Sequence, residues 1–224
     1  MSKCAPWARR IEGRAGGISR RLFLAQIFGE EITVHLTLKR IRRNSPSYEN
    51  ARRLYREAFP PNERAPFFML ARKAEKGLAD WWGVYEKDVW VGFFYVVCVA
   101  KLAYVFYFAV DAQMRGKGYG SRALAALREQ YEGSRIFLAA EAIDPNANNY
   151  AERVRRKRFY LRGGMEELHT HVREGNVIYE LLGTGGSVSE REYSRLIRKW
   201  AGRLWSRAVV MKMLPAEERT GGCK

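Results

Sequence analysis

After the first 33 residues, a strand pattern is followed by a helical one. Val34–Ile41 alternates apolar and polar residues with period two, which predicts a half-buried strand. Tyr48–Phe59 instead repeats its apolar residues at helical spacing, behind the start signal Ser45-Pro46-Ser47. Pro60-Pro61 ends this helix, because proline cannot donate the backbone hydrogen bond. A second helix is predicted over Phe67–Lys76, closed by Gly77.

The middle of the chain is rich in strand-forming residues. Trp81–Tyr85 and Val89–Val99 predict an antiparallel hairpin, and Tyr104–Val110 predicts a third strand. The later elements are a helix over Ser121–Tyr131, a strand over Ile136–Ala140, a helix from Asp144-Pro145-Asn146 to about Tyr160, and strands over Met165–Val172 and Asn176–Leu182. This order predicts an α/β domain with a mixed sheet.

These patterns divide the chain into three parts. Residues 1–33 are predicted to be an N-terminal extension that is poorly ordered or docked as a short helix, or to result from an over-long start. They hold a twin-arginine export pattern at Ser19–Leu24, but Glu30-Glu31 cut its apolar stretch short and no small-residue cleavage site follows. Residues 34–184 form the main domain. Residues 185–224 are predicted to be a helical tail, with one helix or a pair of helices over Ser189–Met213. The apolar stripe of this segment is expected to pack on its own domain, and binding of a partner is the alternative.

The composition is typical of a folded protein from a reducing compartment of the cell. Hydrophobic residues make up 47% of the chain and charged residues 29%. The three cysteines are too few for a disulfide framework or a zinc knuckle, so we expect a cytoplasmic protein. No apolar run reaches the length that spans a bilayer, so no membrane role is expected.

The net charge of +16 raises the question of a nucleic-acid partner, since positive charge attracts any polyanion. The basic residues are scattered over five segments, and none of these lies in a recognisable nucleic-acid-binding module. A basic surface together with a site for an anionic cofactor explains the charge better.

One glycine-rich segment carries the strongest functional signal. Arg115–Gly120 reads RGKGYG and lies between a predicted strand and a predicted helix. Backbone N–H groups in such a loop form an anion site with the positive end of the helix dipole. The spacing fits neither the Walker A pattern nor the dinucleotide-binding fingerprint, because the glycines fall at 116, 118 and 120.

The segment resembles the acetyl-CoA signature of the GNAT superfamily of N-acetyltransferases, Gln/Arg-x-x-Gly-x-Gly/Ala. The upstream run Phe108–Asp111 is similar to that family's fourth strand, and the order of elements over about Val34–Leu182 is the family's order. The resemblance implies the GNAT fold, with a mostly antiparallel central sheet flanked by helices and here a C-terminal helical extension. It also implies that acetyl-CoA is the co-substrate, with binding residues Ala109, Val110, Arg115, Gly116, Lys117, Gly118, Tyr119, Gly120 and Ser121. Arg115, Lys117 and Arg122 would supply counter-charge.

A second match lies downstream, where Arg156–Met165 resembles the family pattern Tyr-x-x-x-Gly-Phe, with Met165 in place of phenylalanine. Tyr160 takes the place of the family's general acid. A phenol within hydrogen-bond reach can protonate the thiolate that leaves a thioester. The alternative is a tyrosine that only packs at the end of a helix.

Three further residues are candidates for the rest of the site. Glu141, at the end of the fifth strand, is the candidate general base, although it could equally orient the substrate or pair with Arg155 or Arg156. Glu63 is a candidate contact to the acceptor, or a solvated surface glutamate. Asn149 follows Asn146 and Asn148, one of which, or Asn149 itself, caps the next helix; Asn149 is also a candidate contact to the pantetheine arm.

No metal is expected. His169 and His171 alternate on a strand and so face one side, but nothing completes a ligand set. The expected function is transfer of acetyl from acetyl-CoA to an acceptor amine, small molecule or peptide, within a ternary complex. The alternative is a non-catalytic module on a GNAT-like fold that senses acyl-CoA or binds RNA. A monomer and a homodimer both remain open.

Overall fold

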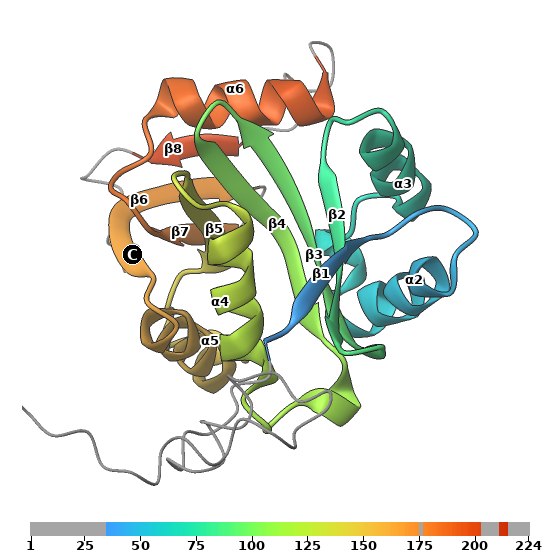
Figure 1. Ribbon diagram of the computed structural model, residues 1–224. Coiled ribbons are helices and arrows are strands. Elements are labelled where there is room, and N and C mark those ends of the chain that lie inside the picture. The colour runs from blue at the N-terminus through green and yellow to red at the C-terminus, as the bar shows by residue number, and fades with distance from the viewer. Residues whose placement is uncertain (1–34, 175–176, 203–210, 215–224) are drawn as a thin grey trace, which may run out of the picture. The chain divides into compact units, whose positions relative to one another are not determined.

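The chain divides into two units, Met1–Val34 and His35–Lys224. The computed structural model describes the second unit over residues 35–174, 177–202 and 211–214 (Figure 1). The predicted N-terminal extension, residues 1–33, lies outside the described residues.

The order of elements agrees with the order predicted from the sequence. The strands are β1 (Thr37–Arg40), β2 (Asp80–Glu86), β3 (Val89–Val99), β4 (Leu102–Val110), β5 (Arg135–Glu141), β6 (Glu166–Glu174), β7 (Val177–Gly183) and β8 (Met211–Leu214). The helices are α2 (Pro46–Ala58), α3 (Phe67–Glu75), α4 (Tyr119–Gln130), α5 (Tyr150–Arg162) and α6 (Glu190–Ala201), with short 3-10 turns η2 (Pro61–Glu63) and η3 (Ala112–Met114).

Within the described residues the strands form one eight-stranded sheet, in the order β1-β2-β3-β4-β5-β7-β6-β8. Only β4 and β5 run parallel, and every other neighbouring pair in this part of the chain is antiparallel. The prediction of a mixed, mostly antiparallel sheet is confirmed.

Helices cover both faces of the sheet, which therefore has a core on each side (Figure 1). Both cores contain buried side chains of the strands; one core adds side chains from α2, α3 and α6, and the other adds side chains from α4 and α5. The start signal of α2 is confirmed, because the Ser45 side chain accepts a hydrogen bond from the Tyr48 N–H.

Helix α5 begins later than predicted. It starts at Tyr150 rather than at Asp144-Pro145-Asn146, because the Asp144 carboxylate accepts the Asn146 N–H and holds this segment in a turn. Asn149 lies at the cap position, but its side chain makes no capping hydrogen bond. An asparagine therefore lies at the predicted cap position, but its side chain does not cap the helix.

Two further predictions need correction. Helix α4 begins at Tyr119 instead of Ser121, which places Tyr119 and Gly120 in its first turn. The predicted same-side arrangement of His169 and His171 is interrupted, because β6 has a bulge between Glu167 and His171 and His169 has a positive φ of 50°.

The C-terminal helix is shorter than predicted. The capping box of Ser189 and Glu192 begins α6, and the helix ends at Ala201, before Gly202. Its stripe packs on its own domain as predicted, with Tyr193, Leu196, Ile197 and Trp200 buried. Met211–Leu214 pairs antiparallel with β6 as strand β8, so the prediction of helix through Met213 is wrong.

Candidate active site

A cleft opens where strands β4 and β5 separate. Their parallel pairing ends at Val105 and Leu138; beyond this point β4 stays paired with β3, and β5 with β7. A cavity of about 1270 Å³ lies in the gap, large enough for an extended ligand.

Nearly all of the candidate residues line this one cavity. They come from the segment after α2, from β4, from the η3–α4 segment, from β5 and from α5. The lining residues among the candidates are Glu63, Ala109, Val110, Arg115, Gly116, Gly118, Tyr119, Gly120, Ser121, Glu141, Asn149 and Tyr160. Lys117 is exposed and is not among them.

The glycine-rich segment presents backbone donors at the start of α4. Gly118 has a φ of 76°, a left-handed conformation that strains any residue with a side chain. A Cβ atom on Gly120 would lie 2.9 Å from the Phe159 ring, so glycine also permits the close approach of α4 to α5. The N–H groups of Gly118, Tyr119 and Gly120 have no hydrogen-bond partner among the described residues. They form a site suited to a phosphate group.

Carboxylates on neighbouring elements fix this segment. The buried Asp111 accepts hydrogen bonds from Arg53 of α2, at 2.6 Å, and from the Gln113 N–H. Burial alone would raise the pKa of Asp111, but these bonds together hold it below its usual range. Glu86 pairs with Arg122 at 2.6 Å, so the charge that Arg122 was predicted to offer is already matched inside the protein.

Tyr160 is buried at the end of α5 and lines the cavity. Within the described part of the chain, no group hydrogen-bonds its hydroxyl. Burial raises the pKa of Tyr160 to about 12, and the positive charge of Arg156 opposes this only in part. The phenol therefore keeps its proton at neutral pH and has no internal acceptor for it.

Glu141 is buried at the end of β5 in a network of three donors. Its carboxylate lies 2.9 Å from Arg153 and 3.1 Å from Arg156, and it accepts a hydrogen bond of 3.1 Å from the Asn149 amide. Arg153 also donates to the Asn149 side-chain oxygen, at 2.7 Å. Both polar ends of Asn149 are thus engaged within the protein, as is the Glu141 carboxylate.

Glu63 has a different environment, at the end of η2. The Tyr107 hydroxyl donates to the Glu63 carbonyl at 3.0 Å and accepts the Ala65 N–H at 3.2 Å, which anchors the segment that carries Glu63. Its carboxylate makes no ion pair or hydrogen bond with the described residues. Burial, and then the negative charge of Glu141, raise the pKa of Glu63. An unpaired, half-buried carboxylate of this kind is suited to a cationic ligand.

The cavity therefore has two chemically different halves. One half, called the donor half below, comprises Ala109, Val110, Tyr160 and the lining residues of the 115–121 segment. The other, called the acceptor half, comprises Glu63 and the aromatic residues Phe59, Tyr104, Phe106, Tyr179 and Trp200. None of these aromatic residues is predicted as a site residue from the sequence; the only signal is the apolar stripe containing Trp200, which predicts packing alone.

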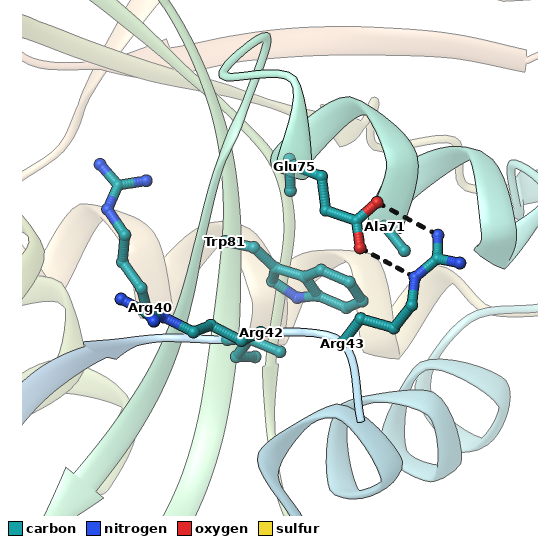
Figure 2. A pocket seen from close by; sticks show the side chains of 8 residues that line it. Arg40, Arg42, Arg43, Ala71, Glu75 and Trp81 are labelled. Carbon is teal, nitrogen blue, oxygen red and sulfur yellow. Dashed lines mark hydrogen bonds and ion pairs between the residues drawn. The ribbon is translucent and has the colours of Figure 1, made fainter. Parts of the chain in front are cut away.

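A second cavity, of about 350 Å³, lies between β1, β2 and α3 and contains none of the candidate residues. Figure 2 shows Trp81 beside the ion pair of Arg43 with Glu75, whose closest atoms are 2.8 Å apart. The side chains of Arg40 and Arg42 extend away from the indole. The basic groups of this cavity do not converge on a common point.

No helix in the described ranges is both long and apolar enough to cross a membrane.

The family model described as Acetyltransferase (GNAT) family matches residues 48–157. This match spans the segments that carry Glu63, Glu141, Asn149 and the donor half apart from Tyr160, which lies three residues beyond it.

Solved structures of such enzymes share the fold. A Bacteroides thetaiotaomicron protein described as a GNAT-family acetyltransferase is 24% identical, covering 79% of this chain and 99% of its own, with a TM-score of 0.59. An aminoglycoside 6′-N-acetyltransferase in complex with coenzyme A is 14% identical, covering 66% of this chain and 96% of its own, with a TM-score of 0.51. A spermidine N-acetyltransferase chimera from Vibrio cholerae is 16% identical, covering 66% and 94%, with a TM-score of 0.51. No curated protein matches the sequence.

Proposed function

Because the chain belongs to the GNAT family of acetyltransferases, we propose that it transfers the acetyl group of acetyl-CoA to an acceptor amine while both substrates are bound. Members of this family are acyl-CoA-dependent N-acetyltransferases. The observation that carries the proposal is the shared cavity, which joins an anion-binding helix start to a protonated, unpartnered phenol.

The donor half fits a coenzyme A ester. Its phosphates are anionic, and the free N–H groups of Gly118, Tyr119 and Gly120, with Arg115 beside them, are suited to such a group. Beyond Val105, the edge of β4 that faces away from β3 is not paired with β5, and around Ala109 it offers main-chain groups to the pantetheine arm. The Val110 carbonyl on this edge accepts a hydrogen bond of 3.0 Å from Arg115, which a pantetheine donor would have to replace. The likeness to an acetyltransferase described as complexed with coenzyme A supports this assignment. Bound acetyl-CoA would supply the acetyl group as a thioester.

Tyr160 is proposed as the general acid. When the acceptor nitrogen attacks the acetyl carbon, the carbon–sulfur bond breaks, and the Tyr160 hydroxyl holds the proton that the sulfur takes up. Its raised pKa keeps that proton in place through neutral and mildly alkaline pH. The acceptor nitrogen loses two protons: one leaves its ammonium group for solvent before the attack, and one leaves after the attack and restores the Tyr160 hydroxyl. The sum is one new carbon–nitrogen bond, one new sulfur–hydrogen bond, one broken carbon–sulfur bond and one proton released to solvent.

The two carboxylates are proposed for different tasks. The prediction that Glu141 is the general base stays a prediction, because its oxygens would have to give up a bond to Arg153, Arg156 or Asn149 before accepting a proton. Glu63 has no such bond to break. We therefore assign to Glu63 the binding of the acceptor's ammonium group, and to Glu141 the fixing of the two arginines near Tyr160. The contacts of Asn149 to pantetheine and of Lys117 to the cofactor also stay predictions.

The first experiment is an assay of acetyl-CoA-dependent thiol release over a panel of amines, with Tyr160→Phe as the test variant. We expect kcat to fall about 100-fold, as is typical when a general acid is removed, with the affinity for acetyl-CoA unchanged in calorimetry. Tyr150→Phe is the matched control, since Tyr150 lies exposed at the start of the same helix, and it should retain wild-type turnover.

Two results would contradict the proposal. An unchanged kcat in Tyr160→Phe would remove Tyr160 from the mechanism. Tight binding of acetyl-CoA without turnover of any amine would favour a non-catalytic acyl-CoA sensor, and salt-sensitive RNA retention without acetyl-CoA binding would favour an RNA-binding module.

A further inference from the structure

Two groups of aromatic side chains line the acceptor half of the cleft. Phe106 of β4 lies against Trp200 of α6, with ring centroids 5.0 Å apart, and against Tyr104, at 4.3 Å. Phe59, which follows α2, packs edge-on against Tyr107 at 4.9 Å. These residues come from three separate elements and meet at the cavity wall.

Trp200 contributes an apolar ring to this surface because its polar groups are used inside the protein. Its ring N–H donates to the Tyr95 hydroxyl at 3.3 Å, and that hydroxyl in turn donates to the Leu70 carbonyl at 3.1 Å. The Trp200 carbonyl accepts a hydrogen bond from Lys73. Helix α6 lies beyond residues 48–157, so this wall is added to the cleft from outside the segment that matches the family model.

The acceptor half offers a cationic ligand little unpaired negative charge. Glu57 pairs with Arg53, and Glu152 pairs with Arg156, which also pairs with Glu141. Among the described residues that line the cavity, Glu63 is the carboxylate without a partner. A ligand with one positive charge can be matched here, whereas the further charges of a polycation would meet paired carboxylates and a chain of net charge +16.

From this combination we propose that the acceptor is a primary amine with a single positive charge carried on an aromatic or bulky apolar body. Resting on the proposed function, this inference names the substrate class of the same site. The ammonium group lies at Glu63, and the apolar body packs against Phe106 and the aromatic residues beside it. Aromatic rings gain from such packing beyond the area they bury.

The experiment compares four amines at saturating acetyl-CoA on the full chain: 2-phenylethylamine, ethylamine, spermidine and kanamycin. We expect kcat/KM for 2-phenylethylamine to exceed each of the others by at least about tenfold. Phe106→Leu should lower the value for 2-phenylethylamine about tenfold and leave the value for ethylamine and the KM for acetyl-CoA unchanged.

Phe68→Leu is the matched control, because Phe68 lies exposed on α3 and is not among the residues that line the cleft. It should behave as the wild type, and thermal unfolding of both variants checks that each is folded.

The outcomes separate this inference from the function on which it rests. Preference for spermidine or kanamycin, or equal loss for ethylamine and 2-phenylethylamine in Phe106→Leu, overturns the inference and leaves the acetyltransferase. Thiol release with none of the amines counts against the acetyltransferase. In that case calorimetry of 2-phenylethylamine against ethylamine on the CoA-saturated protein still decides the inference, since tighter binding of the aromatic amine supports it and equal binding contradicts it.

Discussion

The donor and acceptor halves of the β4–β5 cleft are built from different parts of the polypeptide. The donor half is almost entirely contiguous, running from the end of β4 through η3 into the first turn of α4, and only Tyr160 is added from α5. The acceptor half gathers single side chains from the segment after α2 and from β4, β7 and α6.

The two halves also use different chemistry. In the donor half, backbone N–H groups supply the hydrogen-bond donors. The sequence must therefore permit a particular backbone conformation and leave out a side chain, as at Gly118 and Gly120. In the acceptor half the side chains supply the surface, and many combinations of apolar residues could do so. A site made of backbone groups in one segment can be recognised in the sequence from the spacing of its glycines. A site made of side chains from distant segments has no such pattern.

Of the two halves, the acceptor half should show the larger effect when it is broken, at Glu63. Glu63→Gln removes the charge that we propose binds the acceptor's ammonium group, and a hydrogen bond to a charged group contributes about 1.5–3 kcal/mol. We therefore expect kcat/KM for the acceptor to fall about 30-fold, with the KM for acetyl-CoA unchanged in steady-state assays. Glu75→Gln, which changes a carboxylate outside the cleft, is the control.

The effect of Glu63→Gln on activity should depend on pH in a defined direction. Burial and Glu141 raise the pKa of Glu63, so its carboxylate is uncharged below that value and charged above it. The ratio of wild-type to Glu63→Gln activity should therefore be near one at acidic pH and rise through a midpoint above the ordinary glutamate value of 4.5. A ratio that is constant with pH would show that Glu63 does not bind the acceptor through its charge.

A smaller effect is expected from straining the donor half at Gly118. Gly118→Val places a β-branched residue in a left-handed conformation, at a strain of about 1–2 kcal/mol that the loop can relieve by moving its N–H groups. We expect the KM for acetyl-CoA to rise about tenfold and the KM for the acceptor to stay the same. Gly77→Val is the control, since Gly77 has the same left-handed backbone with open space around it but lies outside the cleft. An equal rise in the KM for acetyl-CoA in both variants would show that the loop has only a structural role.

Much of the fold could be predicted because hydrophobic periodicity is local. The hairpin of β2 and β3 and the start of α2 at Ser45 follow from alternation and from a capping residue. The errors arose where side chains or distant partners decide the structure. The Asp144 carboxylate delays α5, and β8 is a strand that pairs with β6, a partner that local pattern cannot reveal.

The candidate site divides in the same way. The glycine spacing led to the segment that lies at the cavity, and the family pattern led to Tyr160 on its wall. Local sequence could not show that Arg153 joins Arg156 in pairing with Glu141, or that Trp200 reaches the cleft from α6. These contacts depend on how the helices pack across the sheet.

The central claim, that the two halves form one site meeting at Tyr160, is tested most directly by titration calorimetry with a bisubstrate conjugate. The conjugate joins the CoA sulfur through an acetyl linker to the nitrogen of 2-phenylethylamine. Linking two ligands of one site converts the second binding event into an intramolecular one, so we predict affinity at least about 100-fold above that of CoA alone. Binding no tighter than that of CoA would contradict the account.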